Sequence, residues 1–232
     1  MKKEQFYPLG IFLAAMLGGL VRYLVSTWLP ASPDFPWGTL FVNYLGIFCL
    51  IYLVKGYLVY KGTSKGLILA LGTGFCGGLT TFSSLMLDTV KLLDTGRYPS
   101  LKPELAFEYR WRPAFSLLFG EEEMVIVYLA IACGLGALVR YFFSRYNQAS
   151  KLPLGTLIAN LLGCFLIGVF YNHVESKEVY AILATGFCGG LTTFSTLNDE
   201  LQRLLSDKKV FYSYLTLTYI GGLVAIFLGI LL

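Results

Sequence analysis

Seven apolar segments, each long enough to cross a lipid bilayer, follow one another along the chain. They are predicted at 7–29, 38–60 and 66–93, and then at 124–146, 155–172, 179–205 and 210–232. A helix needs about 20 mostly apolar residues to span the hydrocarbon core. The pattern therefore predicts an all-α membrane protein with three spans in its first half and four in its second.

The same short motifs occur twice and in the same order. "TGFCGGLTTFS" stands at 73–83 and again, letter for letter, at 185–195. Two further pairs precede them, "GGLVRY" at 18–23 with "GALVRY" at 136–141, and "GTLFVNYLG" at 38–46 with "GTLIANLLG" at 155–163. The chain is therefore predicted to hold two homologous halves. We assign 1–93 to the first repeat, 94–123 to a connector and 124–232 to the second repeat.

The number of spans in the first half sets the orientation of the second. Three crossings leave the chain on the far side of the membrane, and the connector has no uncharged run that could return it. The two halves are therefore predicted to be an inverted-topology repeat. With a cytoplasmic N-terminus, ten Lys and Arg residues fall on the inside and six on the outside. This excess agrees with the preference of positive charge for cytoplasmic loops, so we expect a multi-pass protein of the cell membrane with its N-terminus in the cytoplasm.

Composition supports this class and excludes others. The chain of 232 residues is 56% hydrophobic and only 14% charged, with a mean hydropathy of +0.66. Its net charge of +4 is spread over loops, which favours a role in membrane orientation and no nucleic-acid partner. The five cysteines stand singly in apolar runs, which is typical of small core residues. We see no nucleophile, base and acid set, so an enzyme is not expected, and no cleavable signal peptide is predicted.

Polar side chains recur inside the spans at matching positions of the two halves. Such groups are costly in lipid unless they face a cavity or a partner. The Asn residues could instead bond a neighbouring helix. The recurring groups are Thr39, Asn43, Thr80, Thr81, Ser83 and Ser84 in the first half, and Thr156, Asn160, Thr192, Thr193, Ser195 and Thr196 in the second.

Two glycine pairs, Gly77-Gly78 and Gly189-Gly190, predict a broken third helix in each half. Paired glycines weaken a helix, and the Thr-Thr that follows can cap a restarted one. Tight helix packing through small residues is the alternative. If the two breaks meet, their freed carbonyl oxygens form a cage that suits a small monovalent cation.

The titratable residues favour passive conduction. The acidic residues Asp88, Asp199 and Glu200 are expected near helix ends and His173 in a loop, whereas proton-coupled exchangers generally need such groups within the membrane. Hydroxyls, amides and the positive edges of Phe rings suit a small anion. Arg22 and Arg140 either snorkel to the headgroups or line an aqueous vestibule that attracts anions.

These motifs resemble the fluoride channel family (Fluc, also called CrcB). The resemblance covers about 7–93 and 124–232 and implies passive fluoride export through two narrow pores that flank a central structural sodium ion. It implies a single-chain pseudo-dimer of antiparallel halves, with fluoride and the lipid bilayer as its partners. Asn43, Asn160, Phe82 and Phe194 would line the pores, with hydroxyls of Thr81, Ser83, Thr193 and Ser195, and Tyr214 and Thr218 on a polar track. Arg22 and Arg140 would line the vestibules, and the carbonyl oxygens of Gly77, Thr80, Gly189 and Thr192 would bind sodium.

The chain departs from the family pattern in three ways. Leu85 and Leu197 stand where a second Phe is frequent. The first half lacks the fourth helix, and the inversion arises by omitting a helix, whereas fused relatives add one. One pore is therefore expected to be well formed and the other degenerate. A small dual-topology multidrug exporter and a transport-inactive structural membrane protein remain the alternative hypotheses.

Overall fold

The computed structural model describes residues 6–29, 35–93, 121–148 and 151–232. The connector predicted at 94–123 lies almost entirely outside these ranges. Three spans make up the described part of the first half. They are α1 (Tyr7–Trp28); α2 (Trp37–Phe48), continued by the π-helix η2 (Cys49–Leu58); and a broken span of α3 (Lys65–Leu69), the π-helix η3 (Ala70–Cys76), α4 (Gly77–Leu79) and α5 (Phe82–Leu93).

The second half repeats this order and adds a fourth span. It consists of α7 (Glu121–Ser144) with the short 3-10 turn η6 (Arg145–Gln148); α8 (Leu154–His173); a broken span of α9 (Lys177–Tyr180), the π-helix η7 (Ala181–Cys188), α10 (Gly189–Leu191) and α11 (Phe194–Leu204); and α12 (Lys208–Leu231). Seven helices in the described ranges are long and apolar enough to cross a membrane. The predicted fold class is confirmed, and the predicted ends differ from the observed ones by no more than about three residues because hydropathy at bilayer length dominates this sequence.

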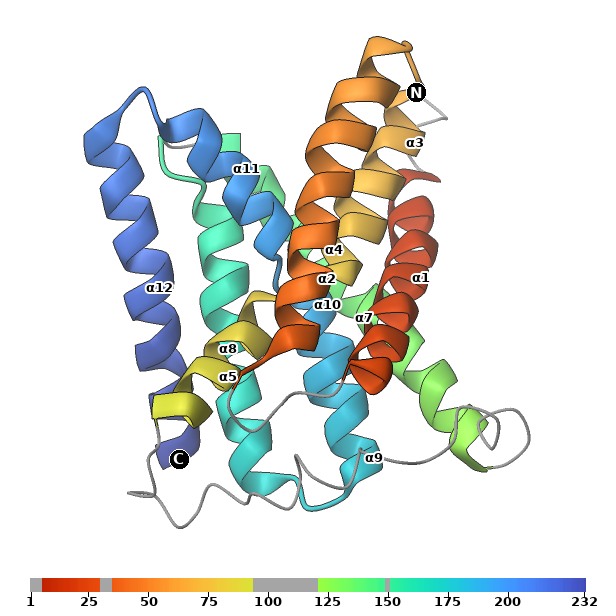
Figure 1. Ribbon diagram of the computed structural model, residues 1–232, viewed down its shortest axis with the longest axis vertical. Coiled ribbons are helices and arrows are strands. Elements are labelled where there is room, and N and C mark those ends of the chain that lie inside the picture. Colours follow the sequence, from red (N-terminus) through yellow and green to blue (C-terminus); the bar gives the residue numbers. More distant parts are fainter. Residues whose placement is uncertain (1–5, 30–34, 94–120, 149–150) are drawn as a thin grey trace.

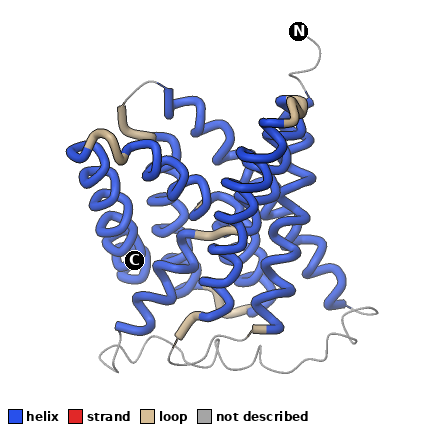
Figure 2. The backbone as a smooth tube through the Cα atoms, turned by 45° about the horizontal axis from the view of Figure 1, so that its top comes forward, coloured by secondary structure: helices blue, strands red, loops and turns tan. Residues whose placement is uncertain are grey.

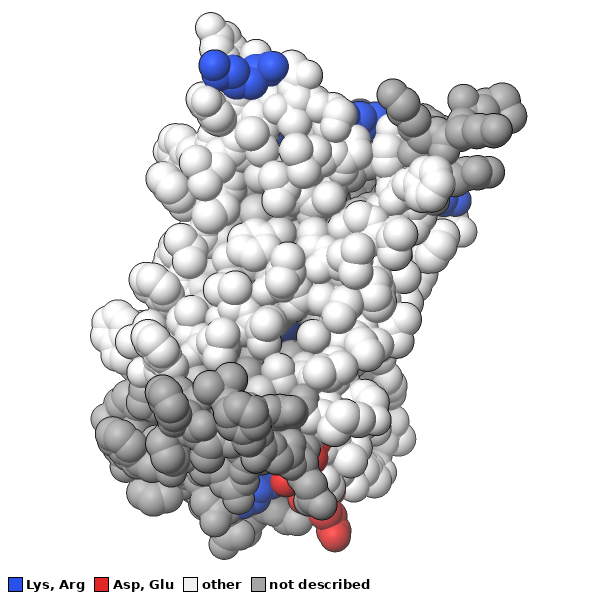
Figure 3. All heavy atoms as spheres, turned by 90° about the vertical axis from the view of Figure 1, so that its right-hand side faces the viewer, with Lys and Arg blue, Asp and Glu red and all other residues white. Residues whose placement is uncertain are grey.

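Corresponding helices of the two halves run in opposite directions. In Figure 1, α1 descends from the upper end of the molecule, whereas α7 rises from the lower end. The extra span α12 descends beside α8, so the last helix ends opposite to where α1 begins. On the face seen in Figure 3, charged side chains gather near the two ends of the molecule, and the broad band between them is almost free of charge. This band is what a bilayer requires of a spanning surface.

The halves pack against each other through helices far apart in sequence. Helix α1 contacts α7, α5 contacts α8, and α11 contacts α2. The largest core cluster joins side chains of α5, such as Phe82 and Met86, to side chains of α8, α11 and α12. The fold is thus a single bundle in which each half completes the other.

Candidate functional site

Both third spans break in the middle of the bundle, as predicted, but the break lies after the glycine pair. Helix α4 ends at Leu79, Thr80 is extended (φ −93°, ψ 151°), and α5 restarts at Phe82. The second half repeats this at Thr192, with φ −91° and ψ 156°. In Figure 2 a short loop interrupts the helical tubes inside the bundle, away from both ends. The glycines themselves remain helical.

Each restarted helix is capped by two threonines, one from each half. Within its own half, the amide of Ser84 donates to Thr81 Oγ1 and that of Thr196 to Thr193 Oγ1, both at 3.2 Å, and a threonine of the opposite half caps the first two residues. The amides of Phe82 and Ser83 donate to Thr192 Oγ1 at 3.2 and 3.3 Å. Reciprocally, the amides of Phe194 and Ser195 donate to Thr80 Oγ1, both at 3.3 Å. Free amides at a helix start need such an acceptor. Because residue i of one half meets residue j of the other and the reverse also holds, these contacts have the form of an isologous, twofold interface.

Asn43 and Asn160 brace the breaks. The amide of Thr81 donates to Asn43 Oδ1 at 2.8 Å, and Asn43 Nδ2 donates to the Thr81 carbonyl at 3.0 Å. Asn160 bonds the Thr193 peptide in the same way, at 2.9 and 3.3 Å. Both side chains are fully buried. Each amide side chain therefore replaces backbone partners that the break removes, and one Nδ2 hydrogen of each remains for another acceptor.

The glycine pairs allow close approach across the bundle. A Cβ on Gly78 would overlap the carbonyl of Ala15 on α1, and a Cβ on Gly190 would overlap that of Cys133 on α7. A Cβ on Gly77 would meet the guanidinium of Arg140, and one on Gly189 that of Arg22. The glycines are thus required by what packs on them, more than by helix weakness.

Arg22 and Arg140 are buried at 3% exposure, so neither snorkels to the headgroups. Arg22 Nη1 donates to the Gly189 carbonyl at 2.9 Å and, at 3.4 Å, to that of Thr80. Arg140 donates to the carbonyls of Gly190 and Thr73, both at 3.0 Å. Each guanidinium therefore joins the two halves by bonding backbone oxygens freed near the breaks.

The two arginines differ at one nitrogen. Arg140 Nε is bonded, whereas Arg22 Nε is the one buried side-chain polar atom in the described residues without a hydrogen-bond partner. Arg22 also lines a cavity of about 180 Å³ between α1, α2 and α5 of the first half and α8 and η7 of the second. Its polar lining comprises Arg22, Ser26, Thr39, Thr81, Ser84, Asp88, Lys91, Tyr180 and Thr185. A buried cationic side chain that lines such a polar cavity suits an anionic ligand.

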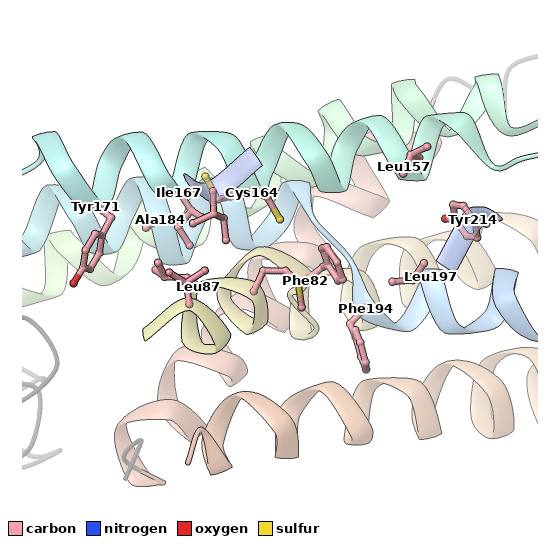
Figure 4. Close-up of a cluster of buried hydrophobic side chains, with 14 of the residues drawn as sticks. Phe82, Leu87, Leu157, Cys164, Ile167, Tyr171, Ala184, Phe194, Leu197 and Tyr214 are labelled. Carbon is pink, nitrogen blue, oxygen red and sulfur yellow. The ribbon is translucent and has the colours of Figure 1, made fainter. Parts of the chain in front are cut away.

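The two Phe side chains expected to line pores lie in different surroundings (Figure 4). Phe82 is fully buried, and its ring meets that of Tyr219 on α12 edge to face, with centroids 5.4 Å apart. Phe194 is 8% exposed, and its helix α11 packs on α2. Ser83 and Ser195 are fully buried in the interface between the halves, where each lies 3.1 Å from the opposite half's threonine hydroxyl.

The fourth helix brings hydroxyls to a buried carboxyl group that the sequence reasoning placed at a helix end. Glu200 is 5% exposed and accepts from Tyr214 at 2.7 Å, Thr156 at 2.8 Å and Asn147 at 2.9 Å. Thr218, also fully buried, donates to the Tyr214 carbonyl. The structure thus places Tyr214 against a carboxyl group that the sequence analysis did not pair with it, and Thr218 lies one turn further along α12.

A corresponding pair in the first half was also missed. Thr39 donates to Asp88 at 2.8 Å, in the arrangement that Thr156 and Glu200 show in the second half. The repeat contained this signal, since Asp88 and Glu200 each lie five residues after the end of the repeated eleven-residue motif. A third acidic residue, Asp199, forms ion pairs with Lys55 of the opposite half and with Arg203. The carboxyl groups therefore lie near the two ends of the interface between the halves.

Comparisons with known proteins agree with the two repeats. The family model described as CrcB-like protein, Camphor Resistance (CrcB), matches residues 9–111 and 127–230. A fluoride-specific ion channel FluC 1 of Streptococcus pneumoniae (strain ATCC BAA-255 / R6) is 97% identical over 109 residues, which are 47% of this chain and the whole of the relative. That relative is therefore less than half as long as this chain.

Two further relatives bear similar names. A fluoride-specific ion channel FluC 2 of Streptococcus pneumoniae serotype 4 (strain ATCC BAA-334 / TIGR4) is 74% identical over 145 residues, or 62% of this chain and 98% of the relative. A fluoride-specific ion channel FluC 1 of Staphylococcus aureus (strain Mu50 / ATCC 700699) is 38% identical over 124 residues, or 49% of this chain and 82% of the relative.

Proposed function

The chain belongs to the CrcB family, and on this premise we propose that it is a channel that conducts fluoride passively out of the cell. The names of its relatives give the ion. The observation in the structure that best supports a passive anion route is the Arg22 cavity, where a buried cationic side chain shares a cavity wall with several hydroxyls. Members of a channel family transport ions and are not enzymes, so we propose transport for this chain and no catalysis.

Arg22 would act by lowering the cost of bringing an anion out of water. A positive charge in a low-dielectric wall attracts anions over several ångströms. The hydroxyls of Thr39, Thr81 and Ser84, which share the cavity with Arg22, supply donors that replace part of the ion's hydration shell. Asp88 also lines the cavity, but Thr39 donates to its carboxyl group and Lys91 lies on the same wall.

We also propose that the two halves form an antiparallel pseudo-dimer within one chain, with the N-terminus in the cytoplasm. The reciprocal threonine caps and the opposite directions of α1 and α7 support this assembly. The distribution of Lys and Arg in the loops supports the orientation.

The sodium ion implied by the family resemblance stays a proposal. The donors fit a monovalent cation in kind, since they are neutral carbonyl oxygens, and the Gly77 carbonyl loses its helical partner because the Thr81 amide bonds Asn43. Gly77, Thr80, Gly189 and Thr192 would hold the ion, which would screen the facing carbonyl dipoles. Two of these oxygens, those of Thr80 and Gly189, already accept from Arg22, whose positive charge opposes a cation at the same place. A higher melting temperature in sodium chloride than in choline chloride would support the site, and equal values would contradict it.

Ion efflux from liposomes tests the function. The purified chain is reconstituted with internal potassium fluoride or potassium chloride, and efflux is started with valinomycin. We expect rapid loss of fluoride and hardly any of chloride. Arg22→Gln should slow fluoride loss by about tenfold, which is the effect of roughly 1.4 kcal/mol on a barrier. Lys61→Gln, at an exposed position far from the cavity, is the matched control.

Three outcomes would contradict the proposal. Equal fluxes of the two halides would remove the selectivity, and no flux at all would favour a structural membrane protein. Efflux of a cationic dye driven by a pH gradient would favour the multidrug exporter.

A further inference from the structure

The polar cavity beside Arg22 holds a second cationic residue, Lys91. This lysine stands near the end of α5, one turn after Asp88, and both side chains line the cavity. Its ammonium group lies over the ring of Tyr171 on α8, with Nζ 5.2 Å from the ring centroid. Tyr171 is buried, and its ring attracts the cation. Lys91 therefore reaches from the first half to the second and is held on the cavity wall.

The wall next to the lysine is apolar. In Figure 4, Leu87 of α5 lies beside Ile167 of α8 and Ala184 of η7, and Tyr171 lies further along α8. The first three of these residues line the cavity together with Lys91. A charge beside apolar walls is screened less than a charge in water, so its attraction for an ion extends further into the cavity.

The charged groups of the cavity do not cancel. Its lining contains two cationic residues, Arg22 and Lys91, and one carboxyl group, that of Asp88. Thr39 donates to this carboxyl group at 2.8 Å, and Lys91 forms no ion pair among the residues that the structure describes. An excess of positive charge in a cavity raises the local concentration of anions.

The equivalent position in the second half has a different charge balance. When the two repeats are aligned on the break motif, Arg203 corresponds to Lys91 and Asp199 to Leu87. The first half therefore lacks the carboxyl group of Asp199, which forms ion pairs with both Arg203 and Lys55. The Arg203 side chain is also 65% exposed, so water and salt screen its charge. Lys91 is thus better placed to attract an anion than its equivalent.

We propose that Lys91 is an anion-attracting residue of the fluoride route, which it serves by concentrating fluoride in the Arg22 cavity, and that its equivalent Arg203 does not serve the route in this way. The inference rests on the proposed fluoride channel function and assigns one part of it to a single lysine. The attraction acts at a distance, so it needs charge at this position and no fixed contact between Lys91 and the ion.

Charge substitutions in the full chain test this role. Initial rates of fluoride efflux from liposomes are measured at low ionic strength for Lys91→Gln, Lys91→Arg and Lys91→Glu. We expect Lys91→Gln to lower the rate about threefold, an effect of roughly 0.65 kcal/mol on one barrier. Lys91→Glu changes the charge by two units and should lower the rate about ninefold. Lys91→Arg keeps the charge and should keep the rate.

Ionic strength separates attraction by charge from a structural effect. Between about 10 mM and about 1 M salt the screening length falls from about 30 Å to about 3 Å. With N-methylglucamine gluconate added on both sides, Lys91→Gln and the unmodified chain should therefore conduct nearly equally. Arg203→Gln is the matched variant of the second half and should lower the rate less than Lys91→Gln at low ionic strength. Lys61→Gln, exposed and outside the cavity, should leave it unchanged.

The outcomes distinguish this inference from the function itself. An unchanged rate in Lys91→Gln at low ionic strength would overturn the inference while the channel function stands. A loss that persists at high ionic strength, or that Lys91→Arg shares, would show a structural role and overturn it as well. An equal loss in Arg203→Gln would overturn the difference between the halves. An unmodified chain that conducts no fluoride would overturn both proposals. If Lys91→Glu fails to elute as a single species in detergent, Lys91→Gln and Lys91→Arg decide.

Discussion

The two halves are most alike where they touch each other and least alike where each meets its own surroundings. The eleven residues of the break motif are identical in both copies, and their threonines, amides and serines form reciprocal contacts. Outside this motif Ile51 is matched by Gly168, Tyr44 by Leu161 and Tyr52 by Val169. A residue at a twofold contact packs against side chains of both halves, so few replacements fit both. A residue on an outer face has one environment and is free to differ.

The largest effect is expected where the broken span of each half packs most closely on the first helix of the same half. Gly78→Ala and Gly190→Ala each place a Cβ on a backbone carbonyl of the neighbouring helix, which cannot rotate away. Overpacking of this kind costs about 1–3 kcal/mol and more where backbone is involved. Both variants should lose the folded, monodisperse species in detergent to a similar extent.

Gly10→Ala is the matched control for these two variants. A Cβ there would lie 3.6 Å from the nearest atom, Ala70 Cβ, which is an ordinary contact. A large difference between Gly78→Ala and Gly190→Ala would show that the two halves do not rely equally on the close approach.

A medium effect is expected at the caps between the halves. Thr80→Val leaves the amides of Phe194 and Ser195 without their acceptor, and Thr192→Val does the same to Phe82 and Ser83. Unsatisfied buried donors cost about 1–3 kcal/mol each. Thermal unfolding in detergent should show an equal drop in melting temperature for the two variants. Thr80→Ser, which keeps the hydroxyl, should restore the native melting temperature. A Val variant as stable as the native chain would contradict capping across the halves.

The smallest effect is expected at Thr156 and Thr39, which occupy equivalent positions but form different numbers of hydrogen bonds. Thr156 donates to Glu200 and accepts from Asn147, whereas Thr39 donates to Asp88. Thr156→Val should therefore lower the free energy of unfolding more than Thr39→Val, by about 1 kcal/mol, the worth of one further hydrogen bond. Urea unfolding of both variants in detergent measures the difference. Equal losses would mean that the bond to Asn147 contributes nothing.

Most of the fold could be predicted from the local hydrophobic pattern, but the candidate site could be predicted only in part. Seven spans and their ends were predicted from hydropathy because bilayer thickness fixes their length. The repeated glycines indicated a break, but its position three residues later depends on Ala15, Cys133 and the arginines, which are distant in sequence. The predicted capping by the Thr-Thr pair is confirmed for Thr81 and Thr193, which cap their own helices, but the sequence could not indicate that Thr80 and Thr192 cap the opposite half. For Arg22 and Arg140 the sequence left two interpretations open, snorkelling to the headgroups or lining a vestibule. Their burial depends on packing between distant helices.

The carboxyl groups show a different limit. Glu200 and Asp199 were expected near a helix end on hydropathy alone, and both are buried at 5% and 6% exposure. Tyr214 comes to Glu200 from the next helix, a contact that the local sequence does not contain. When the two repeats are aligned on the eleven-residue break motif, Asp88 and Glu200 occupy equivalent positions.

The inverted arrangement of the halves, on which the rest depends, is tested most directly by labelling one position at the end of the second span of each half. Lys61 follows the second span of the first half, His173 is the last residue of α8, and both are exposed. Lys61→Cys and His173→Cys are treated in intact cells with a membrane-impermeant maleimide, with the unmodified chain and its five cysteines as background. We predict that His173→Cys is labelled from outside, and that Lys61→Cys reacts only after the membrane is permeabilised. Labelling of both positions from the same side would contradict the account.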